Sequence, residues 1–322
     1  MNFAHIIGHE RQKEVLERAV RQGRLAHAYL FAGPEGVGKR LMVLALVRTL
    51  FCVEERGCGE CPPCRKVDHH NHPDLHILEP DGSSIKIEQV RNIQRDLNLR
   101  PHEAKRKVCL IEAAELMTVG AANALLKTLE EPRGDTLLIL LSSQPQRLLE
   151  TIRSRCQPLC FARQPLELLR DALQSQLGVS DAEAHVLAAL ADGSFKKAFG
   201  KDRQLYLEER RNLLKTLTGL SPGSILPILE FAEQLAADKT ALPDILEIFQ
   251  AFYRDVLLAV HGRDAAELVN LDLVEKVRRV AARENAAGIL LKLEALGQAH
   301  RQLERNLNTQ LVVENLLLKL AA

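Results

Sequence analysis

Short apolar runs alternate with helical stripes through the first half of the chain. Continuous apolar runs predict four buried strands, at 27–32, 74–78, 107–111 and 137–142. Apolar positions at helical spacing predict helices between them, at 15–23, 40–51, 85–97 and 118–130. Strands that alternate with helices in this way predict right-handed βαβ units and a mainly parallel sheet.

The pattern changes after about residue 163, where the strand-like runs stop. Two short helices are predicted at 164–177 and 181–191, and Ser180 with Glu183 forms a capping-box signature for the second. The rest of the chain is helical and rich in leucine. We therefore expect three parts: an α/β core at 1–163, a small helical domain at 164–204 and a helical C-terminal domain at 205–322.

The composition is that of an ordinary globular protein, with 46% apolar and 26% charged residues. The formal net charge is only +1, which gives no global argument for non-specific binding of nucleic acid. The N-terminus is charged too early for a secretory signal. The apolar runs at 41–47 and 137–141 are far shorter than the ~20 residues of a membrane helix. We expect a cytoplasmic protein with no membrane partner, whose seven cysteines are reduced or bound to metal.

A glycine-rich segment, GPEGVGKR, lies between the first predicted strand and a helix, which is the context of a phosphate-binding loop. Its candidate nucleotide-binding residues are Gly33, Pro34, Glu35, Gly36, Val37, Gly38, Lys39 and Arg40. The glycines let backbone N–H groups turn toward an anion, and Lys39 would contact the phosphates of ATP or ADP. A hydroxyl that holds Mg²⁺ is expected after the lysine, and Arg40 cannot provide one. Two interpretations remain open: a vestigial nucleotide site, or a glycine turn without a ligand.

A second departure from an active ATPase follows the strand predicted at 107–111. P-loop ATPases usually carry Asp-Glu there, one residue for magnesium and one to activate water. Here Glu112 takes the metal-facing position with a longer side chain, and Ala113 has no acid–base group. Glu115 is interpreted as a solvated residue at the start of a helix. Together, Arg40 and Ala113 argue against autonomous hydrolysis of ATP.

Four cysteines lie close together with the spacing C-x5-C-x2-C-x2-C: Cys52, Cys58, Cys61 and Cys64. The glycines and prolines between them allow tight turns, and four thiolates suit a structural zinc ion at roughly 2.3 Å. Such a site leaves no open position for catalysis. The alternatives are disulfides, which a reducing compartment disfavours, and four free surface thiols. The remaining cysteines are expected in or near the core: Cys109, Cys156 and Cys160.

With these motifs, the chain resembles the clamp-loader subunits of bacterial DNA polymerase III, relatives within the AAA+ family, over nearly its whole length. The most specific stretches are AANALLKTLEEP at 121–132 and QPQRLLETIRSRC at 144–156. Further likeness lies in RLAHAYLFAGPEGVGKR at 24–40, HPD at 72–74, GSFKKAFG at 193–200 and NLNTQLVVENLLLKL at 306–320. The resemblance implies an α/β P-loop AAA+ core with a zinc insertion at 52–64, then a helical lid and an all-α collar.

The resemblance also implies partners. Such a subunit packs with gamma/tau and delta subunits into a pentamer that places the sliding clamp on primer–template DNA, in the replisome at the nucleoid. By itself the tripeptide Ser154-Arg155-Cys156 indicates no more than a surface ion pair. The resemblance implies instead that Arg155 is an arginine finger for ATP on a neighbouring gamma/tau subunit. Ser142 and Lys196 match sensor positions only weakly.

The leading hypothesis is a scaffold subunit of the DNA polymerase III holoenzyme. It would supply Arg155 in trans, carry structural zinc and hydrolyse no ATP itself. One alternative is an active gamma/tau-like clamp-loader ATPase with an unusual metal site. Another is a zinc-containing DNA-binding protein outside the replisome, which the near-zero net charge disfavours.

Overall fold

A computed structural model describes residues 2–3, 6–131, 135–200, 205–305 and 307–321. The proline at 132, which closes one of the family-like stretches, lies outside the described residues. Contacts divide the chain into two compact units. Unit 1 comprises residues 1–164 and 194–196, and unit 2 comprises residues 165–193 and 197–322. The finer division into three domains remains a prediction.

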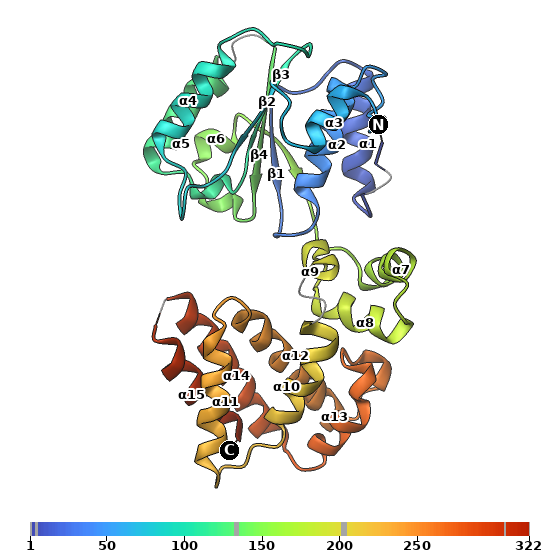
Figure 1. The fold of residues 1–322 in the computed structure, drawn as a ribbon, viewed down its shortest axis with the longest axis vertical. Helices are drawn as coiled ribbons and strands as arrows, with labels where there is room; N and C mark the ends of the chain where they lie inside the picture. The colour runs from blue at the N-terminus through green and yellow to red at the C-terminus, as the bar shows by residue number, and fades with distance from the viewer. Residues whose placement is uncertain (1, 4–5, 132–134, 201–204, 306, 322) are drawn as a thin grey trace. The chain divides into compact units, whose positions relative to one another are not determined.

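A five-stranded sheet forms the centre of unit 1 (Figure 1). Its strands are β1 (Ala28–Ala32), β2 (Leu75–Leu78), β3 (Lys107–Ile111), β4 (Thr136–Ser142) and β5 (Gln157–Cys160). Their order is β2-β3-β4-β1-β5, and every neighbouring pair is parallel. All residues of β1 and β3 are buried, as expected for strands covered on both faces. The predicted parallel α/β core is confirmed.

Helices cover the two faces of this sheet in two groups (Figure 1). One group is α1 (Glu10–Arg21), α2 (Lys39–Phe51) and α3 (Pro62–Asp68); the other is α4 (Ile87–Leu97), α5 (Val119–Glu130) and α6 (Glu150–Arg153). Side chains of β1 alternate between the two hydrophobic cores. Tyr29 and Phe31 pack with the first group, whereas Leu30 packs with the second. The strand β1 therefore lies between the two helical layers, with β4 and β5 as its neighbours in the sheet.

The strand β5 was not predicted from the sequence. It is an edge strand beside β1, contains Pro158, and buries only Leu159 of its four residues. A short, half-exposed strand has no continuous apolar run, and proline is tolerated at an edge. Cys160 is exposed, so its expected place in or near the core was wrong. The other two unassigned cysteines, Cys109 and Cys156, are buried as predicted.

Unit 2 is helical, as the leucine-rich pattern predicts. Its helices are α7 (Leu166–Leu177), α8 (Asp181–Leu190), α10 (Arg210–Leu217), α11 (Ile225–Ala237), α12 (Leu242–Val260), α13 (Val274–Ala281), α14 (Ala286–Glu304) and α15 (Thr309–Ala321), and α9 (Phe195–Phe199) crosses the boundary from unit 1. Ser180 and Glu183 form the predicted capping box at the start of α8. Within the described ranges, no helix combines the length and apolarity needed to cross a membrane.

A buried polar network organises the centre of unit 2. The Arg210 guanidinium is almost fully buried and donates to both carboxylate oxygens of Asp272, at 2.7 and 2.6 Å, and to the Asn270 side chain. The Asp255 carboxylate in turn accepts from the backbone and side-chain N–H groups of Asn270, at 2.8 and 2.6 Å. Buried charges are tolerated when they are paired in this way. The segment that precedes α13 is thereby fixed against α10 and α12.

Candidate functional site

The glycine-rich loop leaves β1 at the carboxyl edge of the sheet and enters α2. The Gly33 N–H donates to the Ser142 carbonyl at the end of β4, at 3.1 Å. A Cβ atom on Gly33 would lie 2.1 Å from the carbonyl oxygen of Phe161, so no larger residue fits without displacement of the backbone. Gly36 has φ 78°, and a Cβ there would lie 2.0 Å from Ser194 Oγ. Close packing against the backbone therefore requires glycine at position 33, and the positive φ favours glycine at position 36.

Lys39 is the buried cation of this loop. Its side chain projects back over the loop, and Nζ donates to the carbonyl oxygens of Gly33 and Pro34, the latter at 2.6 Å. Only 8% of Lys39 is exposed. Burial lowers the pKa of Lys39, and the charges of Glu115 and Glu35 oppose that shift. A phosphate that entered the loop would compete with carbonyl oxygens for this ammonium group.

Arg40 joins the start of α2 to the ends of two strands. Its Nε donates to Glu112 Oε1 at 2.5 Å, and its Nη2 lies 3.6 Å from Glu79 Oε1. Glu79 and Glu112 are the first residues after β2 and β3, which pair in parallel with Leu78 opposite Ile111. Glu79 was not among the residues predicted from the sequence. Its place directly after a predicted strand could have indicated it, because ligand sites gather at the carboxyl ends of parallel strands.

The residues after Glu112 depart from the pattern of an active ATPase. Ala113 has φ 45°, a left-handed conformation, and offers no acid–base group. Glu115 is not the solvated residue that we expected. Its carboxylate accepts from the Ser143 N–H at 2.9 Å and from the Ser143 hydroxyl at 2.5 Å. Burial would raise the pKa of Glu115, but these hydrogen bonds outweigh it and hold the pKa below its ordinary value.

Both weakly assigned sensor residues lie at the loop. Ser142 is buried at the end of β4, where its hydroxyl accepts from the Gln144 N–H at 3.2 Å. The Lys196 N–H donates to the Gly36 carbonyl at 3.2 Å, and Lys196 Nζ donates to Glu35 Oε1 at 2.8 Å. The structure thus gathers these residues around the loop. Whether they sense a nucleotide stays a prediction.

Arg155 stands apart from the loop, at the end of α6. Its Nη2 lies 2.8 Å from Glu130 Oε1, at the end of α5, and its Nη1 donates to the Thr151 carbonyl at 3.0 Å. Its side chain is 37% exposed, and that of Glu130 is 50% exposed. Among the described residues, the guanidinium is therefore held by a surface carboxylate, a carbonyl oxygen and, at 3.5 Å, the Ser154 hydroxyl.

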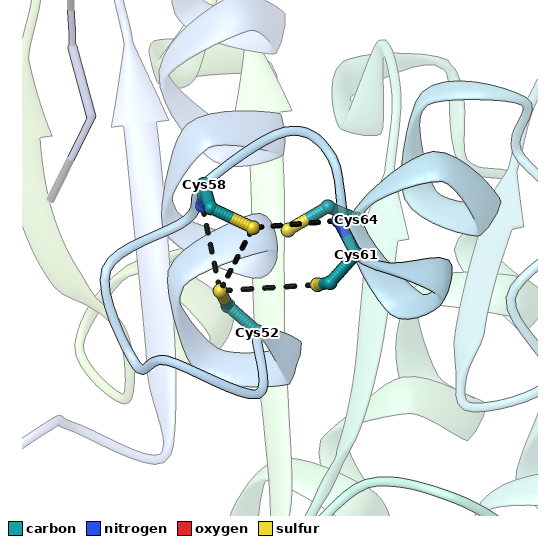
Figure 2. A group of neighbouring side chains, drawn as sticks. All are labelled: Cys52, Cys58, Cys61 and Cys64. Atoms are coloured by element: carbon teal, nitrogen blue, oxygen red, sulfur yellow. Dashed lines mark hydrogen bonds between the residues drawn. The ribbon is translucent and has the colours of Figure 1, made fainter.

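The four clustered cysteines converge at the junction of α2 and α3 (Figure 2). All four sulfur atoms lie within 4.8 Å of one another, and Cys52 Sγ is 3.7 Å from Cys58 Sγ and 3.9 Å from Cys61 Sγ. Zinc–sulfur bonds of ~2.3 Å in a tetrahedron place the sulfurs about 3.8 Å apart, so the donor set fits such an ion. Burial opposes ionisation of Cys52, but nearby N–H groups, that of Cys58 foremost, lower its pKa to about 6.

Two family models match most of the chain. The model described as DNA polymerase III, delta subunit, matches residues 8–165, and the one described as DNA polymerase III, delta subunit, C terminal, matches residues 204–322. The chain is 33% identical over 318 residues to DNA polymerase III subunit delta' of Bacillus subtilis, with 96% of this chain and 95% of the relative covered. It is 34% identical over 311 residues to subunit delta' of Pseudomonas aeruginosa, with 92% of each covered.

The chain is also similar to a longer subunit of the same polymerase. It is 26% identical over 337 residues to DNA polymerase III subunit tau of Bacillus subtilis. That match covers 94% of this chain but only 58% of tau. The likeness to the delta' relatives, by contrast, extends over nearly the whole of both sequences.

Proposed function

The chain belongs to the family of DNA polymerase III delta' subunits of the clamp loader, and we propose that it acts there as an arginine donor that hydrolyses no ATP itself. The proposed partners are gamma/tau and delta subunits in a pentamer, and through them the sliding clamp and primer–template DNA. Because both family models describe DNA polymerase III subunits, the alternative of a DNA-binding protein outside the replisome loses its basis.

The partial exposure of Arg155 and its surface ion pair are the observation that carries the proposal. A planar guanidinium matches the geometry of phosphate oxygens and stabilises charge on a transferring phosphoryl group. Arg155 lies on a short turn, is partly exposed, and is paired with an exposed carboxylate. An ion pair at the surface contributes only ~0–1 kcal/mol, so a phosphate of a neighbouring subunit can replace Glu130 as its partner.

The glycine-rich loop supports the proposal that the chain hydrolyses no ATP itself. Arg40 stands where the Mg²⁺-binding hydroxyl would be, and Ala113 stands where a water-activating carboxylate would be. The alternative of a gamma/tau-like ATPase needs both of these groups. Isolated chain incubated with ATP and Mg²⁺ should therefore release no phosphate above the background of a Lys39→Ala variant. Mg²⁺-dependent turnover that disappears in Lys39→Ala would establish the alternative.

We also propose that the cysteine cluster binds one structural zinc ion, which would link the end of α2 to α3. The convergence of the four thiols supports this assignment. Metal analysis of the purified chain should find about one equivalent of zinc, and Cys58→Ser should lower it to less than half. Cys160→Ser removes an exposed cysteine outside the cluster and is the matched control. Equal zinc content in the two variants would contradict the assignment.

A further inference from the structure

The corner formed by Arg40, Glu79 and Glu112 does not suit the divalent cation that a phosphate-binding loop normally uses. Mg²⁺ demands near-octahedral oxygen ligands at roughly 2.0–2.1 Å, and in such loops one of them is the hydroxyl after the lysine. Arg40 supplies no oxygen. Its guanidinium has only N–H donors and a permanent positive charge, which repels a second cation.

The Arg40 guanidinium also pairs with the two carboxylates that would otherwise attract a metal ion. Arg40 Nε is 2.5 Å from one Glu112 oxygen, and Arg40 Nη2 is 3.6 Å from Glu79. The Glu112 N–H donates to the Leu78 carbonyl at 2.9 Å, which fixes the two strand ends relative to each other. Arg40 belongs to the first turn of α2, directly after the loop. A positive charge is therefore held at this corner by the fold itself.

The rest of the loop keeps the groups that hold phosphate. Gly36 and Gly38 adopt positive φ angles of 78° and 103°, the kind found in anion-binding nests, while the Gly33 N–H bonds to the Ser142 carbonyl. The Lys39 ammonium lies at the same loop, on carbonyl oxygens that a phosphate oxygen can replace. The chain thus combines a loop of the phosphate-binding type with the fixed positive charge of the Arg40 side chain.

We propose that Arg40 replaces the divalent cation, so that the loop binds the phosphates of a nucleotide without Mg²⁺. The inference deepens the proposed function, on which it rests: a subunit that hydrolyses no ATP needs no metal to activate water or a phosphoryl group. Such a loop differs from an empty glycine turn, which would bind no nucleotide. It also differs from an ordinary P-loop, in which Mg²⁺ contributes to the affinity for nucleotide.

The test is a fluorescence titration of the isolated full chain with N-methylanthraniloyl ADP, in buffer with MgCl₂ and in buffer with EDTA. For the wild type, the two Kd values should agree within about twofold. Arg40→Thr restores the missing hydroxyl and releases Glu112. Its Kd should be at least about tenfold lower with MgCl₂ than with EDTA.

Two further variants separate charge from folding. Arg40→Lys keeps the positive charge, so its affinity should stay insensitive to Mg²⁺. Arg21→Thr removes an exposed arginine that pairs with Glu17 at 3.2 Å on α1, and it should behave as the wild type. If thermal melting shows that Arg40→Thr is unfolded, the wild type and Arg40→Lys still decide the question.

Three outcomes overturn the inference. The wild type could bind about tenfold more tightly with MgCl₂, Arg40→Thr could respond to Mg²⁺ as the wild type does, or the wild type could bind nucleotide in neither buffer. Since the isolated chain is used, none of these outcomes bears on whether Arg155 acts on a neighbouring subunit. Turnover of ATP by the isolated chain would instead contradict the proposed function.

Discussion

The loop that follows β1 and the turn that follows α6 both present cations that suit phosphate, but they are held in different ways. The loop is tied to three strand ends: Gly33 bonds to the end of β4, and Arg40 bonds to residues directly after β2 and β3. Among the described residues, Arg155 contacts a surface carboxylate of α5 and groups of its own helical turn. The fold therefore fixes the cations of the loop, whereas the surface ion pair of Arg155 is weak enough for the partner exchange that we propose. Changes in the loop should therefore affect stability more than changes at Arg155 do.

The largest effect on stability is expected from Gly33→Ala. The new Cβ would lie 2.1 Å from the Phe161 carbonyl oxygen, so the backbone must move. We expect the free energy of unfolding in urea to fall by about 2–4 kcal/mol. Gly23→Ala is the control, because it has φ 62° but meets nothing within 4 Å, and it should lose about 1 kcal/mol. Equal losses in the two variants would show that close packing does not define the loop.

A smaller loss, with a characteristic pH dependence, is expected from Glu115→Gln. The pKa of Glu115 lies below its ordinary value of 4.5, so its carboxylate stabilises the fold fully above that pH. We expect a loss of about 1–2 kcal/mol at pH 7. The difference from the wild type should shrink as the pH falls through the lowered pKa. Glu14→Gln, an exposed change on α1, should show no such convergence. A difference independent of pH would contradict the role given to Ser143.

The smallest effect on stability is expected at the arginine turn. Glu130→Gln removes the charge opposite Arg155, and both side chains are more than one third exposed. Solvent screens such a pair, so the free energy of unfolding should change by no more than about 1 kcal/mol. A loss of 2 kcal/mol or more would mean that Arg155 is a structural residue like Arg40, and the contrast between the two regions would disappear.

The sequence predicted the elements whose burial is complete. The strand at 107–111 was placed at its observed bounds, because five consecutive buried residues leave no alternative pattern. The strand β5 was not predicted, because its single buried residue carries no periodic signal. The defects at Arg40 and Ala113 were visible as residue types. The partners of Arg40 and Glu115 could not be predicted. The ion pair between Arg40 and Glu112 joins positions 72 residues apart, and Glu115 is bound by Ser143, which follows β4.

The proposed action of Arg155 is on ATP held by a neighbouring subunit. Its most direct test is single-turnover hydrolysis of ATP by the clamp loader assembled from purified subunits, with primer–template DNA present. Arg155→Ala should slow hydrolysis at the adjacent site by a factor on the order of 10³ or more. Arg155→Lys should recover little of the rate, because lysine lacks the planar fork. The control Arg153→Ala, an exposed arginine on the same turn, should hydrolyse as the wild type does. An Arg155→Ala loader as fast as the Arg153→Ala loader would contradict the proposed action.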